Sequence, residues 1–501
     1  MPVNAARLPG WSSGAGRVLS RAVIGPLAGQ LPPGLVDEVL AECGAVQRRF
    51  RLLPARFGVY FVLGLCLFRG AGYPAVLRQL VAGLEGRLGA AGWACPSGTA
   101  LSRLRGRLGE APFAALLGRL AGPLAGAGDS AGLVCGLLAA GWDGTAAEVR
   151  ASPANVAVLG RARGAHYPQV RLVALVACRS RAVLAAALGP SAGRGSGERA
   201  LARQLLPALR AGMLLLADRG YYSLSLWREA AATGADLLWR VKGNLPLAAV
   251  AVLPDGSWIA EIAGRRDAQR AANRRYYRKT SARPRRAQRR RPPAPGTTVR
   301  VIAFTLVITR GDGTARTEAC RLITTLLDPA AFPAAELAAA YARRWAVETA
   351  FAEIKTCLRG PGTVLRSGDP AGARQELWAF LVLYQAIRIL ICAAAAGAGL
   401  DPGQVSFTTT LHAIRRHHAA APAAALAAVE ADILDPRHLI RHRPGRAWPR
   451  ARRTAAPRAS TPAAPLAHRQ ATTITITPPD PPPPAPQHQP QQPPQPPQAS
   501  P

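Results

Sequence analysis

The feature that most constrains the fold of this chain is a series of short apolar segments between residues 132 and 241. Each has the length of a strand and the near-continuous apolar character typical of strands buried on both faces: residues 132–140, 170–178, 182–188, 213–217 and 236–241. Two stretches with helical spacing, 197–210 and 223–233, separate the last three segments. The order of three strands, a helix, a strand, a helix and a strand predicts an α/β fold.

Two aspartates follow strands of this series. Asp143 comes after the first apolar run, and Asp218 comes directly after the run 213–217. We therefore predict that both aspartates lie at the C-terminal ends of strands. The order of elements is that of a ribonuclease-H-like core, in which a mixed sheet would bring the ends of these strands together.

A predicted helix over residues 334–359 carries the most specific pattern in the chain. At about 100° per residue, four side chains fall within about 60° of arc on one face: Tyr341, Arg344, Glu348 and Lys355. Glu353 lies roughly 100° or more away from Glu348 around the axis and cannot share that face. The alternative is an ordinary exposed face with charged residues at i, i+4 spacing.

Three acidic side chains on separate elements point to one chemistry if they converge. Phosphodiester cleavage by the two-metal route needs several carboxylates around a pair of divalent ions, which activate the attacking oxygen and stabilise the leaving oxygen. Mg²⁺ favours carboxylate ligands. Asp143, Asp218 and Glu348 are therefore the candidate catalytic residues and metal ligands. The cations on the helix are candidates to hold the phosphates of the scissile strand.

These motifs together resemble those of the IS4-type insertion-sequence transposases. The spacing Tyr-x2-Arg-x3-Glu-x6-Lys matches the signature of that family at every fixed position. The segments DGTAAEVRASPANVAVLGR around Asp143 and LLLADRGYYS around Asp218 are similar to its other two catalytic segments. The stretch from LPPGLVDEVLAE to LLPARFGVYFVLGLCLF resembles its N-terminal domain, so the resemblance covers about residues 20–420.

The resemblance implies a DDE transposase that moves a DNA element by cutting and pasting it. It implies a two-metal site for Mg²⁺, for which Mn²⁺ can substitute, held by the three acidic residues. It assigns contacts with the DNA end to three residues of the helix face: Tyr341, Arg344 and Lys355. The implied partners are double-stranded DNA, both the terminal inverted repeats and the target, and a second copy of the chain in a synaptic dimer.

The whole chain divides into regions around this core. They are a flexible N-terminus (1–19), a helical DNA-binding domain (20–130), two parts of the core (131–242, and 331–420 with C-terminal helices), a β-rich insertion (243–330) and a disordered Pro/Gln-rich tail (440–501). Arg103 and Arg107, four residues apart on one predicted helix face of the N-terminal domain, are candidate DNA contacts. A solvated charged face is the alternative for this pair.

The insertion contains an arginine-dense stretch, 265–291, which we expect to be a flexible loop or a DNA-facing ribbon because like charges repel. In the family that the chain resembles, the corresponding insertion stabilises a flipped base at a hairpin intermediate with a tryptophan. Trp258 is the tryptophan inside the insertion. A structural role is the alternative for this residue.

The net charge of +35 favours a polyanionic partner. Part of this excess reflects G+C-rich coding DNA, because nearly all of the basic residues are arginine and Ala, Gly and Pro are also abundant. We expect no membrane association, since the apolar run 377–392 contains Gln385 and Arg388 and predicts a buried helix. The expected location is the bacterial cytoplasm, in association with the nucleoid.

Two other functions remain open from the sequence alone. A catalytically inactive, transposase-derived DNA-binding protein would have the same charge but would need no metal. A host nuclease on the same type of core would cut DNA without joining it and would not require terminal inverted repeats.

Overall fold

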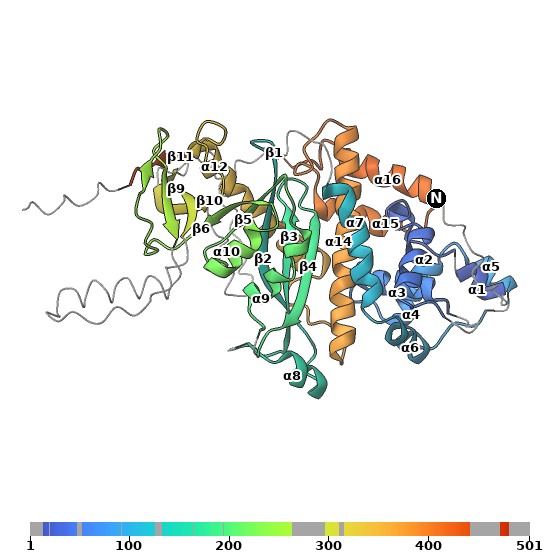
Figure 1. The fold of residues 1–501 in the computed structure, drawn as a ribbon. Helices are drawn as coiled ribbons and strands as arrows, with labels where there is room; N and C mark the ends of the chain where they lie inside the picture. The colour runs from blue at the N-terminus through green and yellow to red at the C-terminus, as the bar shows by residue number, and fades with distance from the viewer. Residues whose placement is uncertain are drawn as a thin grey trace, which may run out of the picture.

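A mixed β-sheet forms the centre of the protein and carries helices on both faces (Figure 1). The computed structural model describes the following residues: 14–19, 21–47, 53–91, 93–125, 133–162, 164–193, 195–262, 296–309, 315–440 and 471–479. The arginine-dense stretch 265–291 lies outside the described residues, as does most of the Pro/Gln-rich tail.

The sheet of the described residues has eleven strands, and its main path runs β4-β3-β2-β5-β6-β10-β9-β8-β7. Their bounds are β1 Leu133–Val134, β2 Leu137–Glu148, β3 Gln169–Ala177, β4 Val183–Pro190, β5 Met213–Ala217, β6 Asp236–Arg240, β7 Ala251–Val252, β8 Trp258–Ile262, β9 Thr297–Thr309, β10 Ala315–Thr324 and β11 Ala471–Ile476. Strand β5 pairs in parallel with both β2 and β6. The other strand pairs are antiparallel, so the sheet is mixed.

Both faces of the central strands are buried, as the continuous apolar runs predict. In β3, Val173 and Leu175 belong to the core on one side of the sheet. Ala174 and Val176 belong to the core on the other side. Alternate residues of one strand therefore join different cores, because successive side chains point to opposite faces.

Helices α9 (Glu198–Arg203) and α10 (Leu224–Ala231) cover one face of the sheet (Figure 1). A segmented helical stretch and a long helix cover the other face: α12 (Ala334–Tyr341), the 3-10 turn η4 (Ala342–Arg344), α13 (Trp345–Ala352), the π-helical segment η5 (Glu353–Leu358) and α14 (Pro370–Gly397). The predicted helix 334–359 is thus a succession of helical types, whose π segment follows Glu348 within one turn and a half.

The helix α14 separates the sheet from the N-terminal helices (Figure 1). Those helices, and the remaining short ones, are α1 Gly14–Leu19, η1 Gly25–Leu27, α2 Pro33–Glu42, α3 Ala55–Leu67, α4 Tyr73–Val81, α5 Glu85–Ala90, α6 Gly98–Leu108, α7 Ala111–Ala125, α8 Pro153–Leu159, η3 Leu206–Ala208, α15 Phe407–His417 and α16 Pro422–Leu434. Within the described residues, α14 is the one helix long and apolar enough to cross a membrane. However, 78% of its most apolar window is buried inside the protein, as expected of a core helix.

Three expectations from the sequence need correction. The N-terminus expected to be flexible over 1–19 is helical from Gly14, and Leu19 is fully buried. The first strand is a hairpin of β1 and β2, turned at Cys135 and Gly136, both of which have positive φ. In the tail expected to be disordered over 440–501, residues 471–476 form β11 on the edge of β9, because their β-branched sequence ATTITI suits a strand.

The region 243–330 continues the central sheet. Its strand β10 pairs with β6 of the core, and β9, β8 and β7 follow outward. The side chain of Trp258 is 3% exposed, and its indole N–H donates a hydrogen bond to the Leu247 carbonyl at 3.0 Å. These contacts favour the structural interpretation of Trp258 over a role at a flipped base.

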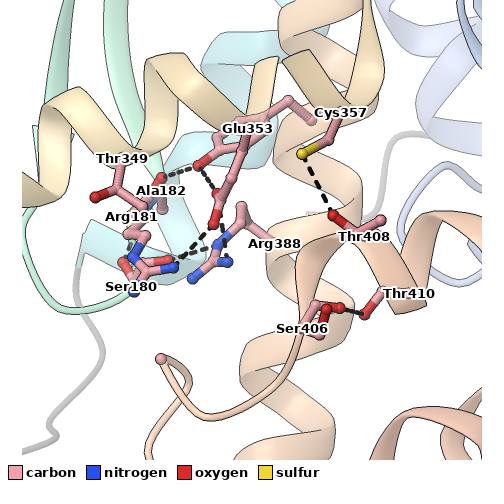
Figure 2. Close-up of polar contacts among 12 residues, drawn as sticks. Ser180, Arg181, Ala182, Thr349, Glu353, Cys357, Arg388, Ser406, Thr408 and Thr410 are labelled. Carbon is pink, nitrogen blue, oxygen red and sulfur yellow. Dashed lines mark hydrogen bonds and ion pairs between the residues drawn. The ribbon is translucent and has the colours of Figure 1, made fainter. Parts of the chain in front are cut away.

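A buried ion cluster joins the π segment to α14 and to the turn between β3 and β4 (Figure 2). The Glu353 carboxylate lies 2.8 Å from Arg181 Nη1 and 3.6 Å from Arg388 Nη1, and it accepts a hydrogen bond from the Tyr384 hydroxyl at 2.9 Å. Arg388 is completely buried, and its Nε donates to the Ser180 carbonyl at 2.8 Å. The Glu353 side chain is thus buried in the interior, on a different face of the helical stretch from Glu348.

Replacing Glu353 should strongly destabilise the protein. We expect Glu353→Ala to lower the free energy of unfolding by about 3–5 kcal/mol, because it leaves the Arg388 charge buried without its partner. Denaturant-induced unfolding followed by circular dichroism measures this change. Glu229→Ala is the control, since the Glu229–Arg203 pair is about 40% exposed and such pairs contribute little. Equal effects of the two substitutions would contradict a structural role of the cluster.

Candidate functional site

The parallel pairing of β2 with β5 brings Asp143 and Asp218 to the same level of the sheet. The last paired residues are Gly141 and Leu216, and each aspartate lies two residues further along its own strand direction. Asp218 follows the end of β5, as predicted. Asp143 does not end β2, because β2 continues to Glu148 against β3; instead Asp143 lies just beyond the end of the parallel pairing.

Gly141 allows the turn η4 and the helix α13 to approach β2 closely. A Cβ atom on Gly141 would lie 2.9 Å from Val347 Cγ2 and 3.6 Å from Arg344 Cγ. Tyr341 connects the same helical stretch to β5, because its hydroxyl donates a hydrogen bond to the Ala217 carbonyl at 3.3 Å. The stretch that bears Arg344 and Glu348 therefore lies directly over the strands that bear the two aspartates.

Arg344 links two of the three predicted acidic residues. Its Nη1 lies 3.5 Å from Asp143 Oδ2, and its Nη2 lies 3.0 Å from Glu348 Oε1. The other oxygen of Asp143 accepts a hydrogen bond from the Gly144 amide at 2.8 Å. The guanidinium thus partly neutralises two carboxylates that would otherwise repel each other.

Burial and the charges of neighbouring carboxylates raise the pKa of both Asp143 and Glu348. Burial is the main cause for Asp143, and the charge of Asp218 also raises its pKa against the lowering effects of Gly144 N–H and Arg344. Burial likewise raises the pKa of Glu348, to which Asp143 and Asp218 add, while Arg344 opposes them. The three carboxylates are therefore close enough to interact electrostatically.

Sequence reasoning missed two residues beside this cluster. The Glu198 carboxylate lies over Gly144, since a Cβ there would be 2.5 Å from Glu198 Cδ, and burial together with Asp143 and Asp218 raises its pKa. The Tyr221 side chain is 2% exposed, and its hydroxyl has no hydrogen-bond partner. The sequence held a feature that could have pointed to each residue as a neighbour of the cluster. Glu198 begins the helix after the third core strand, and Tyr221 follows Asp218 by three residues.

The three candidate carboxylates, with Glu198 as a fourth, suit a hard divalent cation. Mg²⁺ and Mn²⁺ prefer carboxylate oxygens as ligands, and these carboxylates have little compensating positive charge around them. As the side chains lie, no set of three acidic, histidine or cysteine residues in the described part of the chain has an arrangement that could hold a metal ion. Arg344 occupies the space between Asp143 and Glu348 instead.

The predicted DNA-contacting residues occupy two different places. Lys355 is close enough to Asp143 for that carboxylate to raise its pKa, although burial and the nearby Arg359 have larger, lowering effects on it. Tyr341 is only 9% exposed in this structure. Arg103 and Arg107 lie on the exposed side of α6, among the N-terminal helices and across α14 from the aspartates (Figure 1).

Comparisons with known proteins identify the family of this chain. The model of the transposase DDE domain matches residues 143–385, and the model of the insertion element 4 transposase N-terminal region matches residues 21–118. The transposase InsG for insertion sequence element IS4 from Escherichia coli (strain K12) is 28% identical over 397 residues, which are 78% of this chain and 82% of the relative. The match to a solved piggyBac transposase synaptic complex with hairpin DNA covers 83% of each chain, at 8% identity and a TM-score of 0.38.

The protein is therefore a DDE transposase, an enzyme that cleaves DNA and transfers DNA strands. Proteins of this class use divalent metal ions and act on DNA. Because both its N-terminal and its catalytic regions match, the chain belongs to the IS4-type transposases. These matches do not favour the inactive DNA-binding alternative.

Enlarging Gly141 should impair catalysis more than DNA binding. Gly141→Val would push Val347 and Arg344 away from β2, and a displacement of about 1 Å at a catalytic group can cost about 100-fold in rate. We expect the DNA cleavage rate to fall by about that factor while affinity for DNA changes little. Gly118→Val is the control, because no atom lies within 4 Å of a Cβ at this exposed helix position. Equal cleavage rates for the two variants would be the contrary result.

Removing the charge of Asp143 should stabilise the protein in the absence of metal. Because the folded-state pKa of Asp143 is raised, the folded protein binds more protons than the unfolded chain between the two pKa values, and stability falls as pH rises through that window. Asp143→Asn should therefore raise the melting temperature at neutral pH in a chelating buffer. The gain should disappear once the pH falls below the ordinary pKa of aspartate. Thermal unfolding as a function of pH measures it, and a loss of stability at neutral pH would be the opposite outcome.

Proposed function

We propose that this chain moves an insertion sequence by cut-and-paste transposition, with Asp143, Asp218 and Glu348 as its catalytic residues. The observation that supports this assignment best is the position of Arg344, which contacts Asp143 and Glu348 at once beside the end of the strand that leads to Asp218. The strand order β4-β3-β2-β5-β6 also supports a ribonuclease-H-like core for this domain, with the two aspartates on neighbouring parallel strands.

We propose that the three carboxylates hold Mg²⁺ in a two-metal site, for which Mn²⁺ can substitute. When bound, divalent cations activate the attacking oxygen and neutralise charge on the leaving oxygen. The raised pKa values of Asp143 and Glu348 indicate that these groups favour added positive charge. Glu198 is a further carboxylate at the rim of the same cluster.

The cationic residues of the motif would act on the DNA. Arg344 is already held over the aspartates, so its guanidinium is placed to move from the carboxylates to a phosphate of the scissile strand. Lys355 supplies a second charge from the π segment. Tyr341 is predicted to contact the DNA end as well, and in addition its hydrogen bond to Ala217 keeps the helix against β5. Arg103 and Arg107 would bind DNA with the N-terminal helices.

The substrate is proposed to be double-stranded DNA, comprising the terminal inverted repeats of the element and the target. Two element ends have to be brought together before they are joined to the target, so the active form is proposed to be a homodimer. The relative from Escherichia coli suggests a bacterial setting, in which the protein would act in the cytoplasm on the nucleoid.

Alanine substitution of each proposed catalytic residue should abolish strand cleavage. Asp143→Ala, Asp218→Ala and Glu348→Ala should each lower the rate of Mg²⁺-dependent cleavage of a terminal-repeat duplex by about a thousandfold or more, since metal-held groups contribute several kcal/mol to catalysis. Binding of the same duplex should remain, because phosphate contacts come from other residues. Gel assays of cleavage and of binding measure the two properties separately.

Two results would distinguish the proposed roles. Lys355→Ala should weaken DNA-end binding or strand transfer without the same loss of metal affinity. Asp236→Ala serves as the control carboxylate, because Asp236 accepts a hydrogen bond from Thr325 at the opposite end of its strand from the site. Cleavage that persists in any one of the three catalytic variants would refute the assignment of that residue.

A further inference from the structure

A positively charged site lies between the end of α3, α4, α15 and the loop that follows the π segment. A cavity of about 550 Å³ opens there. Its lining combines apolar residues with two arginines and two neutral polar residues: Leu67, Phe68, Arg69, Gly70, Ala71, Ala75, Gln79, Thr363 and Arg415. The lining contains no acidic residue, so its charge is wholly positive.

Arg415 and Arg69 both line this cavity, and none of its lining residues is a carboxylate. Arg415 Nε donates a hydrogen bond to the Leu67 carbonyl at 2.8 Å, whereas its buried Nη2 has no hydrogen-bond partner. Burial lowers the pKa of Arg415, and the charge of Arg69 lowers it further. In the described part of the chain neither arginine forms an ion pair, so the site holds two uncompensated positive charges at close range.

Gly360 leaves room for the end of the Arg69 side chain. Gly360 has a φ of +90°, which favours glycine, and a Cβ atom at this position would collide with Arg69 Nη1. The guanidinium thus occupies the space that any other residue would fill, and it donates a hydrogen bond to the Arg359 carbonyl at 3.3 Å. This contact ties a residue of the N-terminal helical region to the end of the motif helix.

The same helix end connects the cavity to the catalytic cluster. Arg359 is 8% exposed, its Nε has no hydrogen-bond partner, and no carboxylate of the described chain forms an ion pair with it. One turn earlier lies Lys355, whose pKa is lowered by burial and by the Arg359 charge. Lys355 in turn lies near Asp143. Four cations therefore follow one another from the catalytic carboxylates to the cavity.

We propose that Arg69 and Arg415 bind one phosphate of the DNA backbone at a distance from the scissile position, and that the strand runs from there past Lys355 to the catalytic residues. A phosphate in the cavity would accept charge-assisted hydrogen bonds from the guanidinium groups that line it and would offset their charge. The inference rests on the proposed function for the direction of the strand, and on the net charge of +35 for the kind of ligand.

Salt dependence of DNA binding tests this site, since each phosphate neutralised by the protein contributes about 0.9 to the slope of log K against log salt concentration. The probe is a fluorescein-labelled duplex of the terminal repeat, measured by anisotropy in the absence of divalent metal. The double variant Arg69→Gln with Arg415→Gln should lower the magnitude of the slope by about 0.9, the loss of one phosphate contact. Arg69→Lys with Arg415→Lys should keep the slope, because the charge remains.

The matched control is Arg416→Gln, next to Arg415 on α15, because Arg416 is 62% exposed and pairs with Asp432. Its slope should equal that of the wild type. Melting temperatures establish that every variant is folded, and if the double variant does not fold, the exposed Arg69→Gln variant alone provides the comparison, with a smaller slope expected.

An unchanged slope in the glutamine variants would overturn the proposal. Calorimetric titration with inorganic phosphate tests whether the site binds a free anion instead of a DNA phosphate. Phosphate binding that is lost in the double variant while the DNA slope stays the same would mean a free-anion site and would also overturn it. Because the assay involves no cleavage, a reduced slope would stand even if the catalytic assignments of Asp143, Asp218 and Glu348 failed.

Discussion

The rest of the site depends on the parallel register of β2 and β5. Pairing of Gly141 with Leu216 puts the aspartates that follow them side by side, although 75 positions separate Asp143 from Asp218 in the chain (218 − 143). A shift of one residue would turn one aspartate to the opposite face, because side chains alternate along a strand. Buried tryptophans on one face and buried leucines on both faces oppose such a shift. Apolar packing therefore sets the position of the charged groups.

Carboxylates gathered in this way repel each other, and the structure offsets that cost by specific contacts. Arg344 bridges two of them, and the Gly144 amide donates to a third oxygen. The raised pKa values of Asp143, Glu348 and Glu198 indicate that the compensation is incomplete. A site that lacks positive charge in this way is stabilised most when a divalent cation binds to it. This property is expected of a metal-dependent nuclease centre.

The other face of the helical stretch that carries Glu348 holds a carboxylate whose charge is balanced inside the protein. The charge of Glu353 is balanced by two arginines inside the protein, and a tyrosine hydroxyl donates a hydrogen bond to it. These contacts join the π segment to α14 and to the β3–β4 turn (Figure 2). One short stretch thus places Glu348 towards Asp143 and Glu353 towards the core. The π segment begins at Glu353 itself, and such segments often occur at functional sites. Lys355, within this segment, and Arg359, directly after it, form no ion pair with the described residues.

The amino-acid sequence alone determined the order of strands and helices, the two-sided burial of the sheet and the shared face of Arg344 and Glu348, because these features depend on local periodicity. It also located the acidic residues and their likeness to a family. Tertiary structure decided what periodicity does not encode: that β2 passes beyond Asp143, that Arg344 bridges Asp143 and Glu348, and that Glu198 joins the cluster. It also decided that Arg69 meets Arg415 and Gly360. Such contacts join residues far apart in the chain, so they depend on the register of the sheet and on helix packing rather than on local spacing.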